Sequence, residues 1–104
     1  MGVQMTYNDL IQLTIGMNDI VVQEVSAQSA LEIAEFAEAL QENVDSFEDK
    51  RIALVVVADE DERDRQFHEL LQEEVTLPNI QFSKFKDVKL KPTMVLLFKR
   101  LNLW

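Results

Sequence analysis

The stretch Arg51-Ile-Ala-Leu-Val-Val-Val-Ala-Asp59 carries an unbroken apolar run that is rich in valine. β-Branched residues favour strands, and a run without polar residues is typical of a strand that is buried on both faces of a sheet. The acidic segment 60–65 follows without a spacer and opens a helical pattern. A strand, a turn and a helix in direct succession form half of a β-α-β unit. The stretch therefore predicts an α/β fold with residues 51–59 as its central strand.

Length and composition indicate one globular domain that spans residues 1–104. Of the 104 residues, 47% are hydrophobic, 28% are charged and none is cysteine. A chain of this size can bury a sufficient core without disulfides or structural metals. The longest apolar runs, 52–58 and 94–98, are too short to span a membrane, and the N-terminal residues lack the features of a signal peptide. We therefore expect a cytoplasmic protein that does not contact a membrane.

Two amphipathic helices are expected before the central strand. The first covers about residues 7–15, with Thr6 as its cap and Gly16 as its stop. The second starts at the capping box of Ser29 and Glu32. Its buried face is an apolar stripe at steps of three and four residues, made of Ile33, Phe36, Ala37, Leu40, Val44 and Phe47.

One further helix is expected after the central strand. It covers about residues 60–75, because Asp59 can cap its start and the acidic residues that follow favour the positive end of a helix dipole. The polar segment 43–50 is interpreted as the loop that leads into the central strand. Together with the first two, this gives three helices.

The remaining segments are expected to complete the sheet. The alternation Val88-Lys-Leu-Lys91 is typical of an edge strand, and Pro92 separates it from the buried strand that follows. Val56 and Leu96 would then lie on adjacent central strands, in the core. The expected fold class is a single α/β domain with a central mixed sheet of about four strands flanked by three helices. Apart from residues 51–59, the strands are expected at 19–25, 88–91 and 93–98.

The net charge of the chain is −9, and it is unevenly distributed. Residues 1–83 contain eighteen acidic and four basic residues, whereas residues 84–104 contain one acidic and six basic residues. Binding to nucleic acid is not expected, because it requires a surplus of lysine and arginine. The basic C-terminal part either packs beside acidic helices of the same domain or forms a polar protein-binding surface.

Carboxylates gather directly after the central strand, at Asp59, Glu60, Asp61, Glu62 and Asp64. The carboxyl end of a strand is where open α/β sheets place their ligands, so this cluster could hold Mg²⁺ in a small metal-dependent or phosphotransfer domain of the receiver type. The acids are consecutive along a helix, however, and point in several directions, which favours helix capping. His68 has no serine or cysteine partner at a suitable spacing. We therefore expect no enzyme activity, no cofactor and no metal site.

Two charged surfaces and an apolar tail are the candidate partner-binding features. The acidic surface is one face of the second helix, which is either solvated or a dock for a basic partner. The tail after Arg100 would leave alternating apolar side chains in need of cover. The partner is expected to be a protein, either a foreign one or a second copy whose acidic face meets the lysines. The candidate residues are Glu32, Glu35, Glu38, Glu42, Lys89, Lys91, Leu101, Leu103 and Trp104.

Three segments of the chain resemble the thioredoxin-like superfamily. Ala53-Leu-Val-Val-Val-Ala58, followed by an acidic turn and a helix, looks like the central strand that leads into the redox motif of that fold. Lys91-Pro-Thr-Met-Val-Leu-Leu-Phe-Lys99 looks like its cis-proline strand. Phe82-Ser-Lys-Phe85 resembles the approach to that strand in the non-catalytic domains of protein disulfide isomerases. The resemblance covers roughly residues 20–100.

The resemblance implies a redox-inactive thioredoxin-like fold. By register from Ala58, the two cysteine positions of the redox motif are occupied by Asp61 and Asp64. Cysteine-less members of the superfamily bind or position polypeptides. The resemblance therefore implies a non-enzymatic protein-binding or assembly module.

Overall fold

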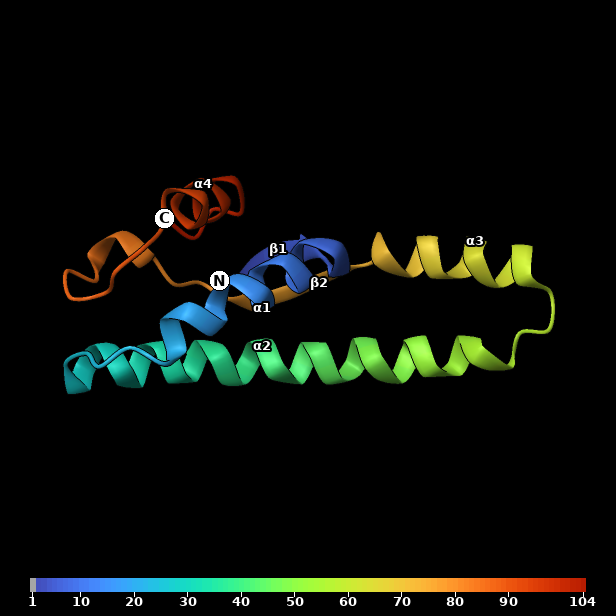
Figure 1. Cartoon of the computed structure of the whole chain (residues 1–104), viewed down its shortest axis with the longest axis horizontal. Coiled ribbons are helices and arrows are strands. Elements are labelled where there is room, and N and C mark those ends of the chain that lie inside the picture. Colours follow the sequence, from blue (N-terminus) through green and yellow to red (C-terminus); the bar gives the residue numbers. More distant parts are fainter. Residues whose placement is uncertain (1) are drawn as a thin grey trace.

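The computed structural model of the chain describes residues 2–104 as a mostly helical and elongated molecule, with extents of 50 × 26 × 22 Å (Figure 1). Within these residues, none of the helices has both the length and the apolar character that a membrane crossing requires. In chain order the elements are β1 (Gly2–Thr6), α1 (Tyr7–Val21), α2 (Ala27–Ala53), η1 (Leu54–Val56), α3 (Glu60–Leu71), β2 (Glu74–Pro78), η2 (Phe82–Lys84) and α4 (Pro92–Arg100), where η denotes a short 3₁₀ turn.

The expected four-strand, thioredoxin-like α/β sheet is wrong. The described residues form a single sheet of two strands, in which β1 pairs antiparallel with β2 and Met5 lies opposite Val75. Four α-helices make up most of the rest of the chain. None of the segments predicted as strands is one, namely 19–25, 51–59, 88–91 and 93–98.

Helix α1 continues past Gly16 instead of ending there. Thr6 caps the helix, as predicted, by accepting a hydrogen bond from the amide of Asp9 at 3.2 Å. The helix then runs to Val21. At Gly16 the side chain of Met94 from α4 lies so close that a Cβ would collide with its Sδ. This glycine therefore permits close packing of two helices and does not stop the first one.

Helix α2 runs along the long axis of the molecule (Figure 1). Its 27 residues, at a rise of about 1.5 Å each, span about 40 Å. Ser26, rather than Ser29, is the cap, and its hydroxyl accepts a hydrogen bond from the Ser29 amide at 3.3 Å. The helix continues through segment 43–50, which was expected to be a loop, because no glycine or proline interrupts it. The predicted stripe does face the core, where Ile33, Phe36, Leu40 and Phe47 are buried.

The segment that resembles a cis-proline strand is helix α4. Pro92 occupies the first turn, where a backbone amide has no acceptor within the helix, so its missing amide hydrogen costs no hydrogen bond. The helix ends in a turn at Asn102, which has a φ of 61°. The amide of Asn102 donates to the Lys99 carbonyl at 3.3 Å, and the amide of Leu103 donates to the Phe98 carbonyl at 2.7 Å. These two bonds are a Schellman ending, and they turn the tail back onto the core.

Part of the core is an aromatic cluster around Phe82. Phe82 is 0% exposed and stacks on Phe98, with 4.1 Å between the ring centroids. The rings of Phe36 and Phe85 meet it edge-on, each with its centroid 5.7 Å away. Residues from α2, η2 and α4 are thereby joined in one cluster.

The basic C-terminal part pairs with acidic helices of the same chain, which was one of the two alternatives drawn from the charge distribution. Ion pairs join Lys84 to Glu32 at 3.1 Å, Lys91 to Asp19 at 3.1 Å and Arg100 to Asp9 at 2.8 Å.

The same part of the chain is also bonded to the start of α2. Asp87 accepts hydrogen bonds from the Ser26 amide at 2.6 Å and from the Ser29 hydroxyl at 3.1 Å. The bond from the Ser26 amide, with a smaller effect of Ser29, lowers the pKa of Asp87 because it stabilises the carboxylate.

Candidate functional site

The last six residues of α2, the connecting residues 54–59 and the first ten residues of α3 form a helical arm, defined here as residues 48–69, which extends to one end of the molecule (Figure 1). At its base the rings of Phe47 and Phe67 lie 6.4 Å apart between centroids. Farther out, every residue of the arm is exposed or only half-buried. The arm is therefore a thin projection of two helices whose outer end faces solvent.

The tip of the arm, defined as residues 52–58, is apolar and exposed. The exposed fraction is 57% for Ile52, 65% for Val55 and 85% for Val56. Large aliphatic side chains that gather at one exposed place mark interaction sites more often than isolated ones do. The tip is therefore the candidate functional site.

Two hydrogen bonds are made by the backbone of the tip at Val57. The amide of Val57 donates to the Leu54 carbonyl at 3.0 Å and closes η1. The guanidinium of Arg63 reaches back from α3 and donates to the Val57 carbonyl at 3.3 Å. The apolar side chains are thus presented by an ordered turn, which reduces the conformational entropy that binding would cost.

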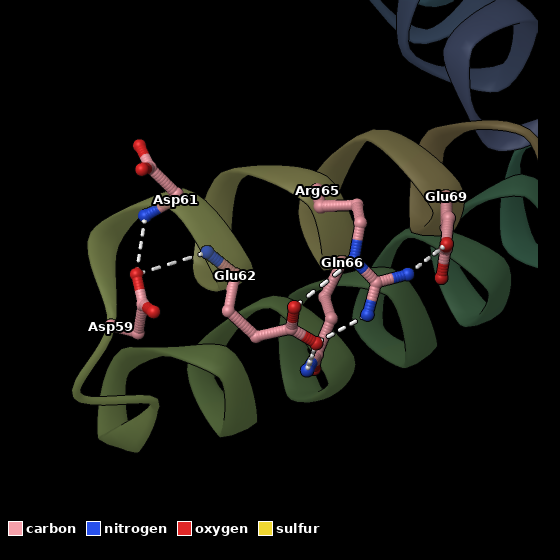
Figure 2. Close-up of polar contacts among 6 residues, drawn as sticks. All are labelled: Asp59, Asp61, Glu62, Arg65, Gln66 and Glu69. Atoms are coloured by element: carbon pink, nitrogen blue, oxygen red, sulfur yellow. Dashed lines mark hydrogen bonds and ion pairs between the residues drawn. The ribbon is translucent and has the colours of Figure 1, made fainter.

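Asp59 starts α3 directly after the tip, as predicted. Its carboxylate accepts hydrogen bonds from the amides of Asp61 and Glu62 at 3.0 and 3.4 Å (Figure 2). One turn later Arg65 pairs with Glu62 and, at 2.5 Å, with Glu69. The hydrogen bond from Arg65 lowers the pKa of Glu62, because it stabilises the charged carboxylate. Two of the five clustered carboxylates therefore have structural roles: Asp59 caps α3, and Glu62 pairs with Arg65.

The acidic residues after the tip do not converge on a common point. Within residues 2–104, no three histidine, aspartate or glutamate side chains are placed so that they could hold a metal ion. His68 lies exposed on α3. No observation in the described part of the chain favours the metal-dependent or phosphotransfer alternative.

The stretch 51–59 is not a buried central strand but the outer end of the arm. Val56 and Leu96, expected to be neighbours in the core, are 85% and 67% exposed. One signal in the sequence points to this outcome. No glycine or proline occurs between Gly16 and Pro78, so nothing stops the second helix before it reaches the apolar run.

The predicted acidic face lies on α2, and its members have different surroundings. Glu32 is half-buried and forms its ion pair with Lys84. Glu35, Glu38 and Glu42 are exposed. The role of these three side chains in binding stays a prediction, whereas Glu32 already has a partner within the chain.

The predicted basic and apolar residues of the C-terminal part divide into two groups. Lys89 and Lys91 are exposed. The tail that was expected to need cover lies in the core instead, because Leu101 and Leu103 are 5% and 0% exposed, and Trp104 is half-buried. The chain's own body covers these leucines, so their side chains are not presented to a partner.

Comparisons with known proteins give no relative of this chain. No protein-family model, no curated protein and no solved structure matches it. A function for the chain must therefore be inferred from the tip and its surroundings.

Val56→Asp is expected to change the free energy of unfolding by no more than about 0.5 kcal/mol, because an exposed side chain keeps its new charge in water. The matched variant Val3→Asp is expected to unfold the domain, since Val3 is 9% exposed and an unpaired charge would be buried there. Urea denaturation followed by circular dichroism measures both. If Val56→Asp unfolded the domain, that result would indicate that residues 51–59 are buried in the core and would contradict the structure.

Proposed function

We propose that this chain is a non-enzymatic protein-binding module that contacts its partner with the tip of the arm, residues 52–58. The observation that carries the proposal is the exposure of Ile52, Val55 and Val56 at one place. Complete burial of a valine or isoleucine side chain contributes about 1.5–3 kcal/mol. Three such side chains, one at the end of α2 and two in η1, provide a substantial driving force for association.

The shape of the arm supports this role. The tip lies at the end of a two-helix projection, away from the sheet and the aromatic core (Figure 1). A projection of this kind can enter a hollow in another protein without a collision between the two bodies. The ordered turn at Leu54–Val57 means that little order has to be created when the tip binds.

Charges around the tip narrow the class of partner. The arm contains eight acidic and four basic residues. An acidic environment repels nucleic acid and anionic lipid surfaces. The complementary partner is a protein with an apolar hollow and a cationic rim.

A role without catalysis is supported by the placement of the ionisable side chains near the tip. Asp59 caps α3, and Glu62 is held by Arg65. His68, the one histidine of the chain, is exposed on the helix. The proposed location of the protein is the cytoplasm, as expected from its sequence.

Site-specific photocross-linking tests the proposal. A benzophenone side chain is placed at position 56 and, in a control chain, at position 96, because Leu96 is also an exposed aliphatic residue but lies on α4. In extracts of the source cells, the probe at position 56 is expected to form cross-links to protein that the probe at position 96 does not form. Adding Val55→Asp to the chain with the probe at position 56 is expected to remove them.

Two results would reject a protein-binding tip. One is cross-linking to protein at position 96 with none at position 56. The other is cosedimentation of the chain with vesicles of zwitterionic phospholipid that is abolished by Val55→Asp, which would identify the tip as a lipid-binding element.

A further inference from the structure

A basic segment, residues 84–91, lies at the end of the molecule opposite the tip. Segment 84–91 contains four lysines and one aspartate, and it lies at the far end from the arm (Figure 1). Asp87 is bonded to Ser26 and Ser29 at the start of α2, whereas the tip follows the last turn of α2. The 27 residues of that helix separate the two ends by about 40 Å. The chain is thus a rod with an acidic arm at one end and a basic segment at the other.

A surface hollow of about 250 Å³ lies at this basic end. Its apolar lining residues are Ile20, Leu90 and Met94, and its polar lining residues are Asp19, Gln23, Lys89 and Lys91. We call it the lysine-rimmed hollow. It combines apolar side chains with a surplus of positive charge, two lysines against the one carboxylate of Asp19, and these are the two features expected of a partner for the tip.

Hydrogen bonds fix the rim of the hollow. The side-chain amide of Gln23 donates to the Lys89 carbonyl at 2.8 Å, and its oxygen accepts from the Lys89 amide at 2.8 Å. Lys91 pairs with Asp19 at 3.1 Å. The ammonium group of Lys89 has no ion-pair partner within residues 2–104. The hollow is therefore formed in advance and keeps a cation available for an incoming carboxylate.

We propose that the tip of one copy of the chain occupies the lysine-rimmed hollow of a second copy. This inference rests on the proposed function, because it identifies the partner of the tip. Val55 and Val56 enter the apolar interior, and the carboxylates of the segment 59–61 face Lys89 and Lys91. The surplus of acids on the arm and the surplus of lysines on segment 84–91 attract each other, which orients the two copies before contact.

The contact joins two different surfaces, so its geometry determines the type of assembly. Each copy has one tip and one hollow about 40 Å apart along α2. Repetition of such a heterologous contact gives a ring if the rotation closes and a filament if it does not. A tip-to-tip dimer is disfavoured, because it brings two acidic arms together.

Sedimentation of mixed variants tests the inference. Val56→Asp removes the tip, and the double variant Lys89→Glu with Lys91→Glu removes the cationic rim; all three side chains are exposed, so both chains are expected to fold. The unaltered chain is expected to form assemblies whose size grows with concentration. Each variant alone is expected to be monomeric, with its dissociation constant raised at least tenfold. An equimolar mixture is expected to form dimers and nothing larger, because it contains one intact tip and one intact hollow per pair.

Ile15→Asp is the matched control, since Ile15 is 67% exposed on α1 and lies outside both surfaces. This variant is expected to assemble like the unaltered chain. Two results would overturn the inference. In the first, Ile15→Asp abolishes assembly and the tip and rim variants do not. In the second, the equimolar mixture stays monomeric although the unaltered chain assembles.

The cross-linking at position 56 separates a failure of this inference from a failure of the proposed function. A chain that is monomeric at every concentration but cross-links to a foreign protein at position 56 would overturn the second copy as partner and leave the binding tip in place. A monomeric chain without cross-links at position 56 would overturn both.

Discussion

Phe82→Ala is expected to lower the free energy of unfolding by about 3–5 kcal/mol, the range for removing a large aromatic side chain from a core. Phe82 is 0% exposed and lies at the centre of the aromatic cluster, with Phe98 stacked 4.1 Å away and Phe36 and Phe85 at 5.7 Å. Because small domains have a total stability of about 5–15 kcal/mol, the variant is expected to be partly unfolded at 37 °C. The midpoint of urea denaturation measures the loss.

Phe67→Ala is the control for this prediction. Phe67 is half-buried at the base of the arm and touches one other aromatic ring, that of Phe47. Its truncation is expected to cost clearly less than that of Phe82. An equal loss in the two variants would show that the arm, rather than the cluster around Phe82, carries the stability of the domain.

The second large effect is expected from Leu103→Ala, which should lower the free energy of unfolding by about 2–5 kcal/mol. Leu103 is 0% exposed, and the Schellman turn at Asn102 directs it into the core. Its carbonyl also accepts a hydrogen bond from the Phe82 amide at 2.8 Å, which ties the tail to η2. Thermal and urea denaturation both report the change.

Leu96→Ala is the matched control, because it removes the same atoms from an exposed leucine of α4. Leu96 is 67% exposed, so its truncation is expected to change the stability by no more than about 0.5 kcal/mol. The α/β arrangement expected from the sequence makes the opposite prediction, with Leu96 in the core and Leu103 in an exposed tail. A neutral Leu103→Ala together with a destabilising Leu96→Ala would therefore contradict the helical fold.

Local signals in the sequence were reliable where the cause of the structure is itself local. Thr6 and Asp59 cap the helices that they were expected to cap, because a cap depends on a side chain and on amides two or three residues further along. The apolar stripe of the second helix was also predicted, since Ile33, Phe36 and Phe47 repeat at helical spacing and are buried.

Segments whose local pattern fits both a strand and a helix were assigned to the wrong element. Residues 93–98 are apolar enough for a buried strand, but Met94, Phe98 and Leu101 also lie at steps of four and three residues, which is the spacing of a helix face. Pro92 is compatible with both, because it can precede a strand or occupy the first turn of a helix. Packing against Gly16 of α1 and Phe82 of η2 favours the helix.

The candidate site shows most clearly what the sequence could not decide. The run 52–58 is the longest apolar run of the chain, yet its composition alone does not say whether other segments cover it. Burial depends on the surface that the rest of the chain can offer, and here the core is built from α1, α2, α4, η2, the sheet and the inner end of α3 at Leu70. The long helix α2 carries the run beyond the reach of that core.

Three properties of this protein could be read from its sequence: where the first and third helices begin, which face of the second helix is buried and how the charges divide along the chain. Those properties follow from neighbouring residues or from a simple count. Two further properties depend on the folded chain as a whole: the valine-rich stretch is a tip and not a central strand, and Leu101 and Leu103 are core residues and not a free tail. A hydrophobic side chain is buried only where distant segments pack against it, and no local pattern specifies such long-range contacts.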